Sequence, residues 1–410
     1  MNRRHFLSHS AAIASSFPFI NSLLANSENI KKQNKSAILL WMGGGPSTID
    51  LWDLKPGEVT GGPFRPISTS ADGVQICEHL PLLSKQMHNL SIIRNMSTRE
   101  ADHTRGRYYM HTGYVPNPNI EHPSYGSVIS HELVKDISGL DIPPFVSVGG
   151  PSVNAGFLGA TYNPFVVDSN GNIRDLNFDI PQNRVADRLK MLQAIETKFV
   201  KEKRGSIAED HLKVIDKTVK IMTTTQMDVF KVGKEPKEIQ DRYGNTGFGR
   251  GCLMARRLVE LGVPFIEVDL GGWDNHADIF PTLQNEKLPE LDKAMSALVE
   301  DLDQRGLLDS TAIIWMGEFG RTPNINGNAG RDHWAKSWSV VVGGAGFNRG
   351  IVVGETSIDG KEIVGDSYTS QDLMVSVLKS LDISLETTFT AKNGRPMKIA
   401  NSGKVIRELF

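Results

Sequence analysis

The sequence predicts an α/β fold with a mainly parallel central sheet flanked by helices on both sides. Short apolar runs that end in glycine-rich loops are typical of strands buried on both faces, and SAILLWM before GGGP is the first of them. Between such runs lie segments with apolar residues at i, i+3, i+4 and i+7, which indicates amphipathic helices. This alternation favours parallel strands joined by crossover helices. The 410 residues, 39% of them hydrophobic, suit one large domain or two.

The predicted strands are short and rich in Val, Ile and other apolar residues. They are residues 36–42, 90–96, 144–150, 263–270, 311–317 and 338–344. Ligands of open α/β sheets bind outside the carboxyl ends of the strands. The loops that follow these runs are therefore where we look for a functional site.

The predicted helices lie between and after these strands. They are residues 105–113, 125–134, 185–224, 248–262, 286–306 and 371–383. Residues 181–245 are rich in Lys and Glu, so we expect them to form a helical cap or insertion rather than part of the core. The sequence contains no internal repeat.

The N-terminus resembles a twin-arginine export signal. Arg3 and Arg4 precede a mildly apolar stretch that ends at Leu24 and is too short and polar for a good membrane span. The alternative is a disordered tail. An export signal predicts transport by the twin-arginine route to the periplasm or cell surface, and no transmembrane helix in the mature chain. The expected organisation is a signal, a polar linker and one α/β domain, at residues 1–25, 26–35 and 36–410.

Charge and cysteine content exclude some functions. The chain has 45 Lys and Arg against 47 Asp and Glu, for a net charge of −2, without any block of like charge. This argues against a nucleic-acid partner. Cys77 and Cys252 allow one disulfide, but their spacing does not require it. Cys252 lies on the apolar face of a predicted helix, so a buried thiol is the simpler interpretation.

Carboxylates and imidazoles gather in the loops after three of the predicted strands. The candidates are Asp50, Asp274, His276, Glu318 and His333. Asp, Glu and His bind Zn²⁺, Mn²⁺ and similar ions, and clustered anions at one sheet edge would repel each other without a cation. The sequence therefore predicts that these residues bind a divalent metal, zinc or manganese, as one or two ions.

Each of these residues also has an ordinary structural explanation. Asp50 could cap the N-terminus of a helix, and Asp274 could occupy a turn. Asp332, beside His333, could hydrogen-bond the backbone in an Asx turn. The metal interpretation rests on the set rather than on any one residue.

A second candidate region runs from Met96 to Tyr114. Thr104 lies near a predicted helix start, where a hydroxyl is placed to attack a phosphorus or sulfur centre and free N–H groups favour an anionic substrate. Arg105 could recognise the substrate oxygens in a bidentate manner. The alternative is an ordinary capping Thr with a solvated Arg.

Several ordered motifs resemble one family. The segments GGGPSTIDLWDLKP, GGWDNH, MGEFGRTP and GRDHW, together with the closing NGRPMKIANSGKVIREL, are similar to bacterial exported proteins known as domain of unknown function 1501. The resemblance runs from about Ser36 to the C-terminus. It implies membership of the alkaline phosphatase and sulfatase superfamily, and therefore a three-layer α/β sandwich with a site on the strand ends that often holds two metal ions.

The resemblance also implies roles for individual residues. It places a first-strand metal ligand at Asp50, the nucleophile at His103 or Thr104, and further metal ligands at Asp274, His276 and His333. The superfamily pattern expects Asp-His where this sequence has Glu318 and Phe319, and Phe cannot bind a metal. The sulfatase segment C-x-P-x-R is absent, so we expect no formylglycine.

The sequence thus predicts an exported metal-dependent hydrolase acting on a phosphate, sulfate or related ester, including a sulfated or phosphorylated polysaccharide. Thr104 would attack, and His103 or His111 would protonate the leaving group. Charge on the substrate oxygens would be neutralised by Arg105, Arg321 and Arg331. The alternatives are a non-catalytic exported binding protein that keeps the fold and a metal site, and a transferase of phosphoryl-type head groups. The oligomeric state is left open.

Overall fold

A computed structural model describes most of the chain. The described residues are 34–137, 139–173 and 220–410, together with Arg184, Asp187, 190–192, Ala194 and Thr197. The expected export signal, nearly all of the linker, and most of the helix expected at 185–224 lie outside the described residues.

The centre of the protein is an eight-stranded sheet with strand order β12-β4-β11-β8-β1-β7-β5-β6. Its strands are β1 (Ser36–Trp41), β4 (Leu90–Met96), β5 (Phe145–Val148), β6 (Phe165–Val167), β7 (Phe265–Asp269), β8 (Thr311–Met316), β11 (Trp338–Gly343) and β12 (Val352–Val353). Strand β11 runs antiparallel to both β4 and β8. The other neighbouring pairs are parallel, which confirms the mainly parallel sheet.

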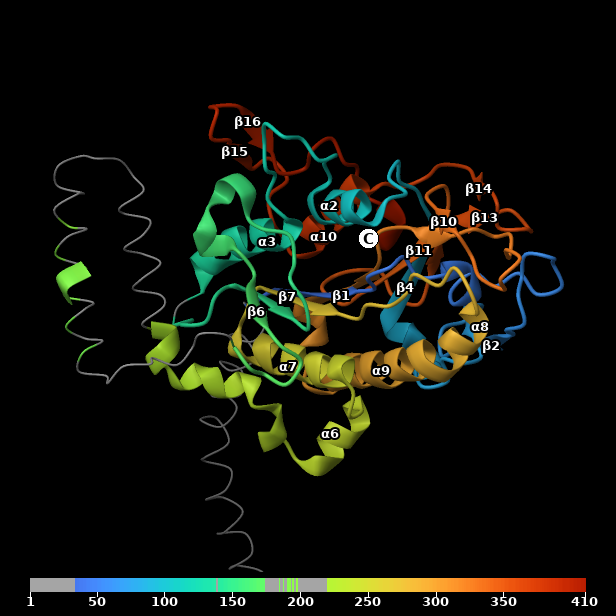
Figure 1. Cartoon of the computed structure of the whole chain (residues 1–410), viewed down its shortest axis with the longest axis horizontal. Coiled ribbons are helices and arrows are strands. Elements are labelled where there is room, and N and C mark those ends of the chain that lie inside the picture. Colours follow the sequence, from blue (N-terminus) through green and yellow to red (C-terminus); the bar gives the residue numbers. More distant parts are fainter. Residues whose placement is uncertain are drawn as a thin grey trace, which may run out of the picture.

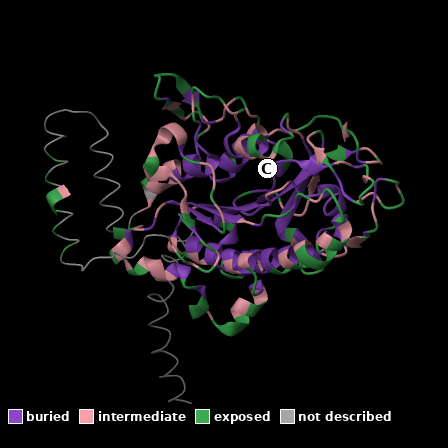
Figure 2. Cartoon of the chain, in the orientation of Figure 1, coloured by how far each residue is buried: buried purple, intermediate pink, exposed green. Residues whose placement is uncertain are grey.

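Helices cover both faces of this sheet (Figure 1). One layer contains α7 (Gly247–Leu261) and α9 (Leu288–Gln304), and the other contains α2 (His103–Thr112), α3 (Tyr125–Leu133) and α10 (Ser370–Ser380). Strand β1 shows why two layers are needed, because Ile38 and Leu40 join one hydrophobic core while Ala37, Leu39 and Trp41 join the other. Figure 2 shows the buried sheet between the two layers. The predicted three-layer α/β sandwich is confirmed.

Helix boundaries follow from capping residues. The side chain of Thr246 accepts a hydrogen bond from the Gly249 N–H at the start of α7, and Gly262 ends that helix at φ +92°. Helix α10 begins with a capping box between Thr369 and Asp372. Apart from the helix expected at 185–224, the predicted helices lie within a few residues of their observed limits, and these local signals explain why.

Smaller elements decorate the sandwich. Short antiparallel pairs are β2 (Pro66–Ser68) with β3 (Gln75–Cys77), β9 (Gly320–Arg321) with β10 (His333–Trp334), β13 (Glu355–Thr356) with β14 (Ile363–Val364), and β15 (Thr388–Thr390) with β16 (Pro396–Lys398). Helix α6 (Lys237–Tyr243) packs on α7 and α9, and α8 (Ile279–Thr282) leads through a π-helical turn into α9. The pairing of β9 with β10 folds the glycine-rich segment 322–332 back on itself.

Two further features bear on the sequence interpretation. Cys77 and Cys252 are both buried and free, and burial raises the pKa of the Cys252 thiol well above its usual value. Across the residues that the structure describes, none of the helices has the length and apolar character needed to cross a membrane.

Candidate metal centre

Three predicted site residues converge at the carboxyl end of the sheet. One ligand atom from each of His103, Asp274 and His333 lies within 4.8 Å of the others. His103 opens helix α2 after β4, Asp274 lies in the loop after β7, and His333 lies in β10, in the excursion that follows β8. Strands far apart in the sequence therefore deliver these side chains to one place, as expected for an open α/β sheet.

His103 bridges two carboxylates. Its Nδ1 lies 2.6 Å from Oε1 of Glu318, and its Nε2 lies 3.3 Å from Oδ2 of Asp274. The same Glu318 oxygen accepts a hydrogen bond of 3.0 Å from the Gly44 N–H. The hydrogen bond to Glu318 raises the pKa of His103 above 6.5, against the opposing effect of partial burial. Glu318 thus orients this imidazole so that Nε2 faces Asp274.

His276 and His333 are oriented in the same manner. The Nδ1 of His276 lies 2.8 Å from Oδ1 of Asp332, and the Nδ1 of His333 lies 2.7 Å from the Ala101 carbonyl oxygen. Donation from each Nδ1–H leaves an Nε2 lone pair, the arrangement typical of metal-binding histidines. The two Nε2 atoms are 3.2 Å apart, and that of His276 lies 2.9 Å from Oδ1 of Asp274.

Asp274 is the anion at the centre of this cluster. Its Oδ1 lies 2.6 Å from Nη2 of Arg321 and 3.4 Å from Nε2 of His333. Partial burial raises the pKa of Asp274, but the hydrogen bond and charge of Arg321, with His103 and His276 nearby, outweigh it and lower that pKa to about 2. The carboxylate is therefore ionised at neutral pH and available as a ligand.

Two buried atoms at the centre have no hydrogen-bond partner among the described residues. They are Nε2 of His103, whose contact with Asp274 lacks hydrogen-bond geometry, and Oε2 of Glu318. An unsatisfied buried polar atom costs about 1–3 kcal/mol, so such atoms call for a partner. A divalent cation accepts imidazole and carboxylate lone pairs together. The residues present therefore fit a metal ion.

Arg321 is a fully buried cation beside the cluster. Besides contacting Asp274, it donates to the carbonyl oxygens of Gly44, of Gly45 at 2.7 Å and of Arg331 at 3.2 Å. Burial lowers the pKa of this guanidinium. These bonds hold Arg321 in place, so it acts on the site by fixing Asp274 and the glycine loop after β1.

Close backbone approach explains two of the glycines around the site. A Cβ atom at Gly44, where φ is +113°, would lie 2.6 Å from the Asp274 backbone nitrogen. A Cβ atom at Gly330 would lie 2.1 Å from the His276 carbonyl group. Larger residues at either position would push apart the loops that carry the imidazoles.

Phe319 forms an apolar wall of the site. Its side chain is fully buried, and its ring centroid lies 5.0 Å from that of His103 and 4.7 Å from that of His333. The position at which the superfamily pattern expects a further histidine is therefore filled by hydrocarbon that packs on the two imidazoles.

Asp50 and Arg331 lie in a separate, fully buried ion pair. Both carboxylate oxygens of Asp50 accept hydrogen bonds of 2.8 Å from Arg331, and Oδ2 also accepts one of 2.6 Å from the Ser47 hydroxyl. Arg331 further donates to the carbonyl oxygens of Thr60 and Thr322. Both side chains are saturated by these contacts, and neither is among the residues that converge on Asp274.

The remaining predicted residues of α2 do not join the cluster. Asp102, not Thr104, caps the helix, since its side chain accepts from the Arg105 N–H at 3.0 Å. Thr104 is exposed, and among the described residues its hydroxyl has no hydrogen-bond partner. Arg105 forms a bidentate pair with Glu100 at 2.7 and 2.9 Å.

His111 lies deeper in the protein than the cluster. It is buried, its Nδ1 lies 2.8 Å from the Arg107 carbonyl oxygen, and its Nε2 lies 3.2 and 3.3 Å from the two carboxylate oxygens of Glu267. Its ring also packs on Trp41 with 4.3 Å between centroids. These contacts place it in a second polar cluster below the strand ends.

Comparison with known proteins identifies the family. The model of the family "Protein of unknown function (DUF1501)" matches residues 34–410. The chain belongs to this family. No curated protein matches the sequence.

Solved structures similar to this DUF1501 protein include sulfatases and alkaline phosphatases. The PsFucS1 sulfatase from Pseudoalteromonas sp. is 14% identical, with 88% of this chain and 70% of that chain covered and a TM-score of 0.41. Alkaline phosphatase from the Antarctic bacterium TAB5 is 12% identical, with 85% and 98% covered and a TM-score of 0.38. Phosphonate monoester hydrolase SpPMH from Silicibacter pomeroyi is 10% identical, with 91% and 76% covered and a TM-score of 0.36. At these TM-scores the likeness carries no argument about activity.

The sequence does not predict the roles of two residues near the candidate site. Asp332 was noted only as a turn residue, although it orients His276. Asp269 was treated as part of a strand, but it is the last residue of β7 and its side chain is partly exposed. The signal for Asp269 is an acidic residue near the end of an apolar run, one residue before two glycines.

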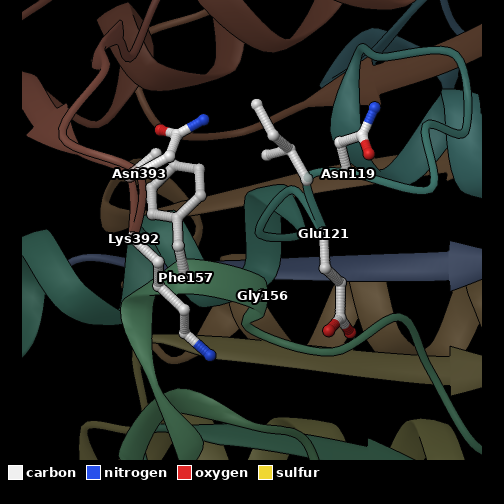
Figure 3. A pocket seen from close by; sticks show the side chains of 8 residues that line it. Asn119, Glu121, Gly156, Phe157, Lys392 and Asn393 are labelled. Carbon is white, nitrogen blue, oxygen red and sulfur yellow. The ribbon is translucent and has the colours of Figure 1, made fainter.

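One cavity among the described residues lies away from the candidate metal ligands. It has a volume of about 280 Å³ and is lined by Ile120, Gly156 and Ala391 together with the residues labelled in Figure 3. Figure 3 shows Phe157, Lys392 and Asn393 on one side of it and Asn119 and Glu121 on the other. None of the residues of the imidazole cluster lines this cavity, so it is separate from the candidate metal centre.

Proposed function

We propose that this protein is an exported hydrolase that uses one divalent metal ion, zinc before manganese, to cleave a phosphate, sulfate or related ester. The observation that carries the proposal is the arrangement of three imidazoles around Asp274. Each presents its Nε2 to the centre while an acceptor holds its Nδ1. Imidazole nitrogens with one carboxylate favour zinc over ions that prefer oxygen alone. The expected twin-arginine signal supports export.

The ligands in this proposal are His103, Asp274, His276 and His333. Glu318 and Asp332 orient two of the imidazoles, and such outer partners raise ligand basicity. When bound, a divalent ion would polarise a substrate oxygen and lower the pKa of a bound water. Asp274 is kept ionised by Arg321, so it does not need to lose a proton before it can bind an ion.

The contacts around Phe319 and Arg321 support one ion rather than two. Phe319 offers no lone pair where a further ligand is expected. The buried guanidinium of Arg321 lies 2.6 Å from Asp274 and supplies a permanent positive charge there. A second divalent ion against this cation would be repelled.

The environment of Thr104 supports water as the attacking group. The Thr104 hydroxyl is exposed and no base contacts it, whereas a hydroxyl nucleophile requires a base, a lowered pKa or a metal. Arg105, Arg321 and Arg331 are each engaged by a carboxylate. Recognition of the anionic group therefore depends on the bound ion more than on these three guanidinium groups.

A non-catalytic metal-binding protein is the second candidate. The observation that favours it is the Arg321 contact, which already occupies Oδ1 of Asp274 with a buried cation. Such a protein would bind a stoichiometric ion and remain inert towards esters.

Elemental analysis of purified protein, combined with zinc and manganese titration, tests the proposal. We expect one ion per chain in the wild type and loss of that ion in His103→Ala, Asp274→Ala and His333→Ala. His88→Ala, which removes an exposed imidazole outside the cluster, serves as the matched control and should keep its metal. Metal content that is unchanged in the cluster variants would reject the metal centre. Metal binding without turnover of any phosphate, sulfate or phosphonate ester would favour the non-catalytic candidate.

A further inference from the structure

Asp269 is a mostly buried carboxylate at the end of a central strand. It ends β7 and its side chain is 21% exposed. Among the described residues no donor makes a hydrogen bond to it, and its nearest cation is Arg107, with 3.9 Å between Nη2 and Oδ1. A mostly buried carboxylate usually accepts several hydrogen bonds, so this one calls for an external donor.

Glycines from three loops surround this carboxylate. A Cβ atom at Gly43, after β1, would lie 3.8 Å from its Oδ1. Cβ atoms at Gly150, after β5, and at Gly271, after β7, would lie 3.4 and 3.7 Å from its Oδ2. Because glycine has no side chain, none of these three residues covers the carboxylate with a Cβ atom.

The Asp269 carboxylate lies close to the candidate metal centre. Gly43 lies beside the Asp269 side chain. The backbone N–H of the next residue, Gly44, donates to Glu318, and Gly44 also packs against the Asp274 backbone. The Cα atoms of consecutive residues such as Gly43 and Gly44 are about 3.8 Å apart. One small substrate could therefore reach both the Asp269 carboxylate and the candidate metal centre. Arg107 also follows His103 by one turn of α2, which places both side chains on the same side of the helix.

Donor groups lie beside the Asp269 carboxylate. Arg107 is 30% exposed, and its Nη2 lies 2.5 Å from the Pro151 carbonyl oxygen and 3.4 Å from Glu267. Burial raises the pKa of Asp269, with Arg107 opposing this and Glu267 adding to it. The indole N–H of Trp41, which lies close to Gly43 in space, is also buried and has no hydrogen-bond acceptor among the described residues. A hydroxyl group both donates and accepts, so it matches a carboxylate and a guanidinium together.

We propose that Asp269 and Arg107 form a hydroxyl-binding subsite beside the metal centre, which takes the alcohol part of a polyol or sugar ester. The ester-binding half of this arrangement rests on the proposed function. Asp269 accepts a hydrogen bond from a substrate hydroxyl, and Arg107 donates to the same or a neighbouring oxygen. The subsite selects hydroxylated substrates over plain alkyl esters.

Binding of a matched pair of ligands tests the subsite. Glycerol 1-phosphate and propyl phosphate share the phosphate ester and differ in two hydroxyls. Calorimetry on the zinc-loaded full chain should show glycerol 1-phosphate binding about tenfold more tightly, the size expected for a hydrogen bond to a charged group. Asp269→Ala should abolish this preference and leave propyl phosphate affinity within about twofold. Asp269→Asn should keep part of the preference, and the exposed control Asp72→Ala all of it.

A second measurement separates this proposal from the proposed function. Saturation-transfer NMR with methyl glucoside on metal-free protein reports the subsite without an ester or an ion. We expect a signal in the wild type that is lost in Asp269→Ala and kept in Asp72→Ala. If methyl glucoside binds through Asp269 while propyl phosphate does not bind, the subsite stands and the hydrolase proposal fails. A wild type without preference for either hydroxylated ligand, or a preference that survives Asp269→Ala, would overturn the subsite.

Discussion

Replacing Asp50 by Asn tests whether this residue stabilises the protein or binds metal. The sequence predicted a metal ligand, whereas the structure places Asp50 in an ion pair with Arg331 in which both side chains are fully buried. Asp50→Asn keeps the shape of the side chain and removes its charge. The guanidinium of Arg331 then stays buried without a counter-ion. Arg331 lies two residues before His333 in the sequence.

The expected loss follows from these contacts. Removing one partner of a buried ion pair costs about 3–5 kcal/mol, because the other charge is left unpaired. Arg331 would keep its hydrogen bonds to carbonyl oxygens, among them those of Thr60 and Thr322, so we expect a value near the lower end, about 3 kcal/mol. Urea unfolding would show it as a lower midpoint with an unchanged slope. Metal content per folded chain should stay at the wild-type value.

Two outcomes would refute this reasoning. A loss below about 1 kcal/mol would mean that the pair does not stabilise the fold in the expected way. A folded, equally stable variant without its metal would make Asp50 a ligand after all. The double variant Asp50→Asn with Arg331→Met supplies the control, because it removes both charges and should be less destabilised than Asp50→Asn alone.

Three further predictions concern the surroundings of the site. Asp332→Ala should weaken zinc binding by about 10–100-fold, because it removes the carboxylate that orients His276. A competition titration with a chelator measures the zinc affinity. An unchanged affinity would exclude His276 as a ligand. Thr104→Ala should keep ester turnover within about threefold of wild type, while a loss above about a hundredfold in kcat would restore Thr104 as the nucleophile. Burial would raise the pKa of Glu267, but His111 and Arg107 outweigh it and hold that pKa below 4.5. The stabilisation from Glu267 should therefore be complete above about pH 4.5 and decline as pH falls through the lowered pKa. The difference in unfolding free energy between wild type and Glu267→Gln should shrink below pH 4.5, and a difference that is flat with pH would contradict this.

The fold was largely predictable because its signals are local. The runs at 36–42 and 311–317 contain β1 and β8, and the helical pattern at 286–306 contains α9. Strands β6 and β12 were missed because three and two residues are too few to show a pattern. The antiparallel direction of β11 was also not foreseen, because strand direction depends on where the preceding chain enters the sheet.

The site was only partly predictable because proximity is set by packing between distant segments. His103, Asp274 and His333 stand where polar residues follow apolar runs, and that pattern was visible. Asp50 follows a strand in the same manner, yet its loop turns the carboxylate towards Arg331 rather than towards the imidazoles. The sequence pattern cannot distinguish Asp274 from Asp50, because each is an acidic residue in the loop after a strand. The two differ only in the direction in which that loop turns the carboxylate.

The position of β1 within the sheet has a consequence for the order of assembly. The first strand of the domain pairs with β7 and β8, and contacts across these interfaces span long stretches of chain, such as the 227 residues between Ser36 and Val263. The Gly44 hydrogen bond to Glu318 at the site spans 274 residues. Contacts between residues so far apart in the sequence form late and slow folding. Because its members extend from His103 to His333, the imidazole cluster forms only after the chain has been made at least as far as His333.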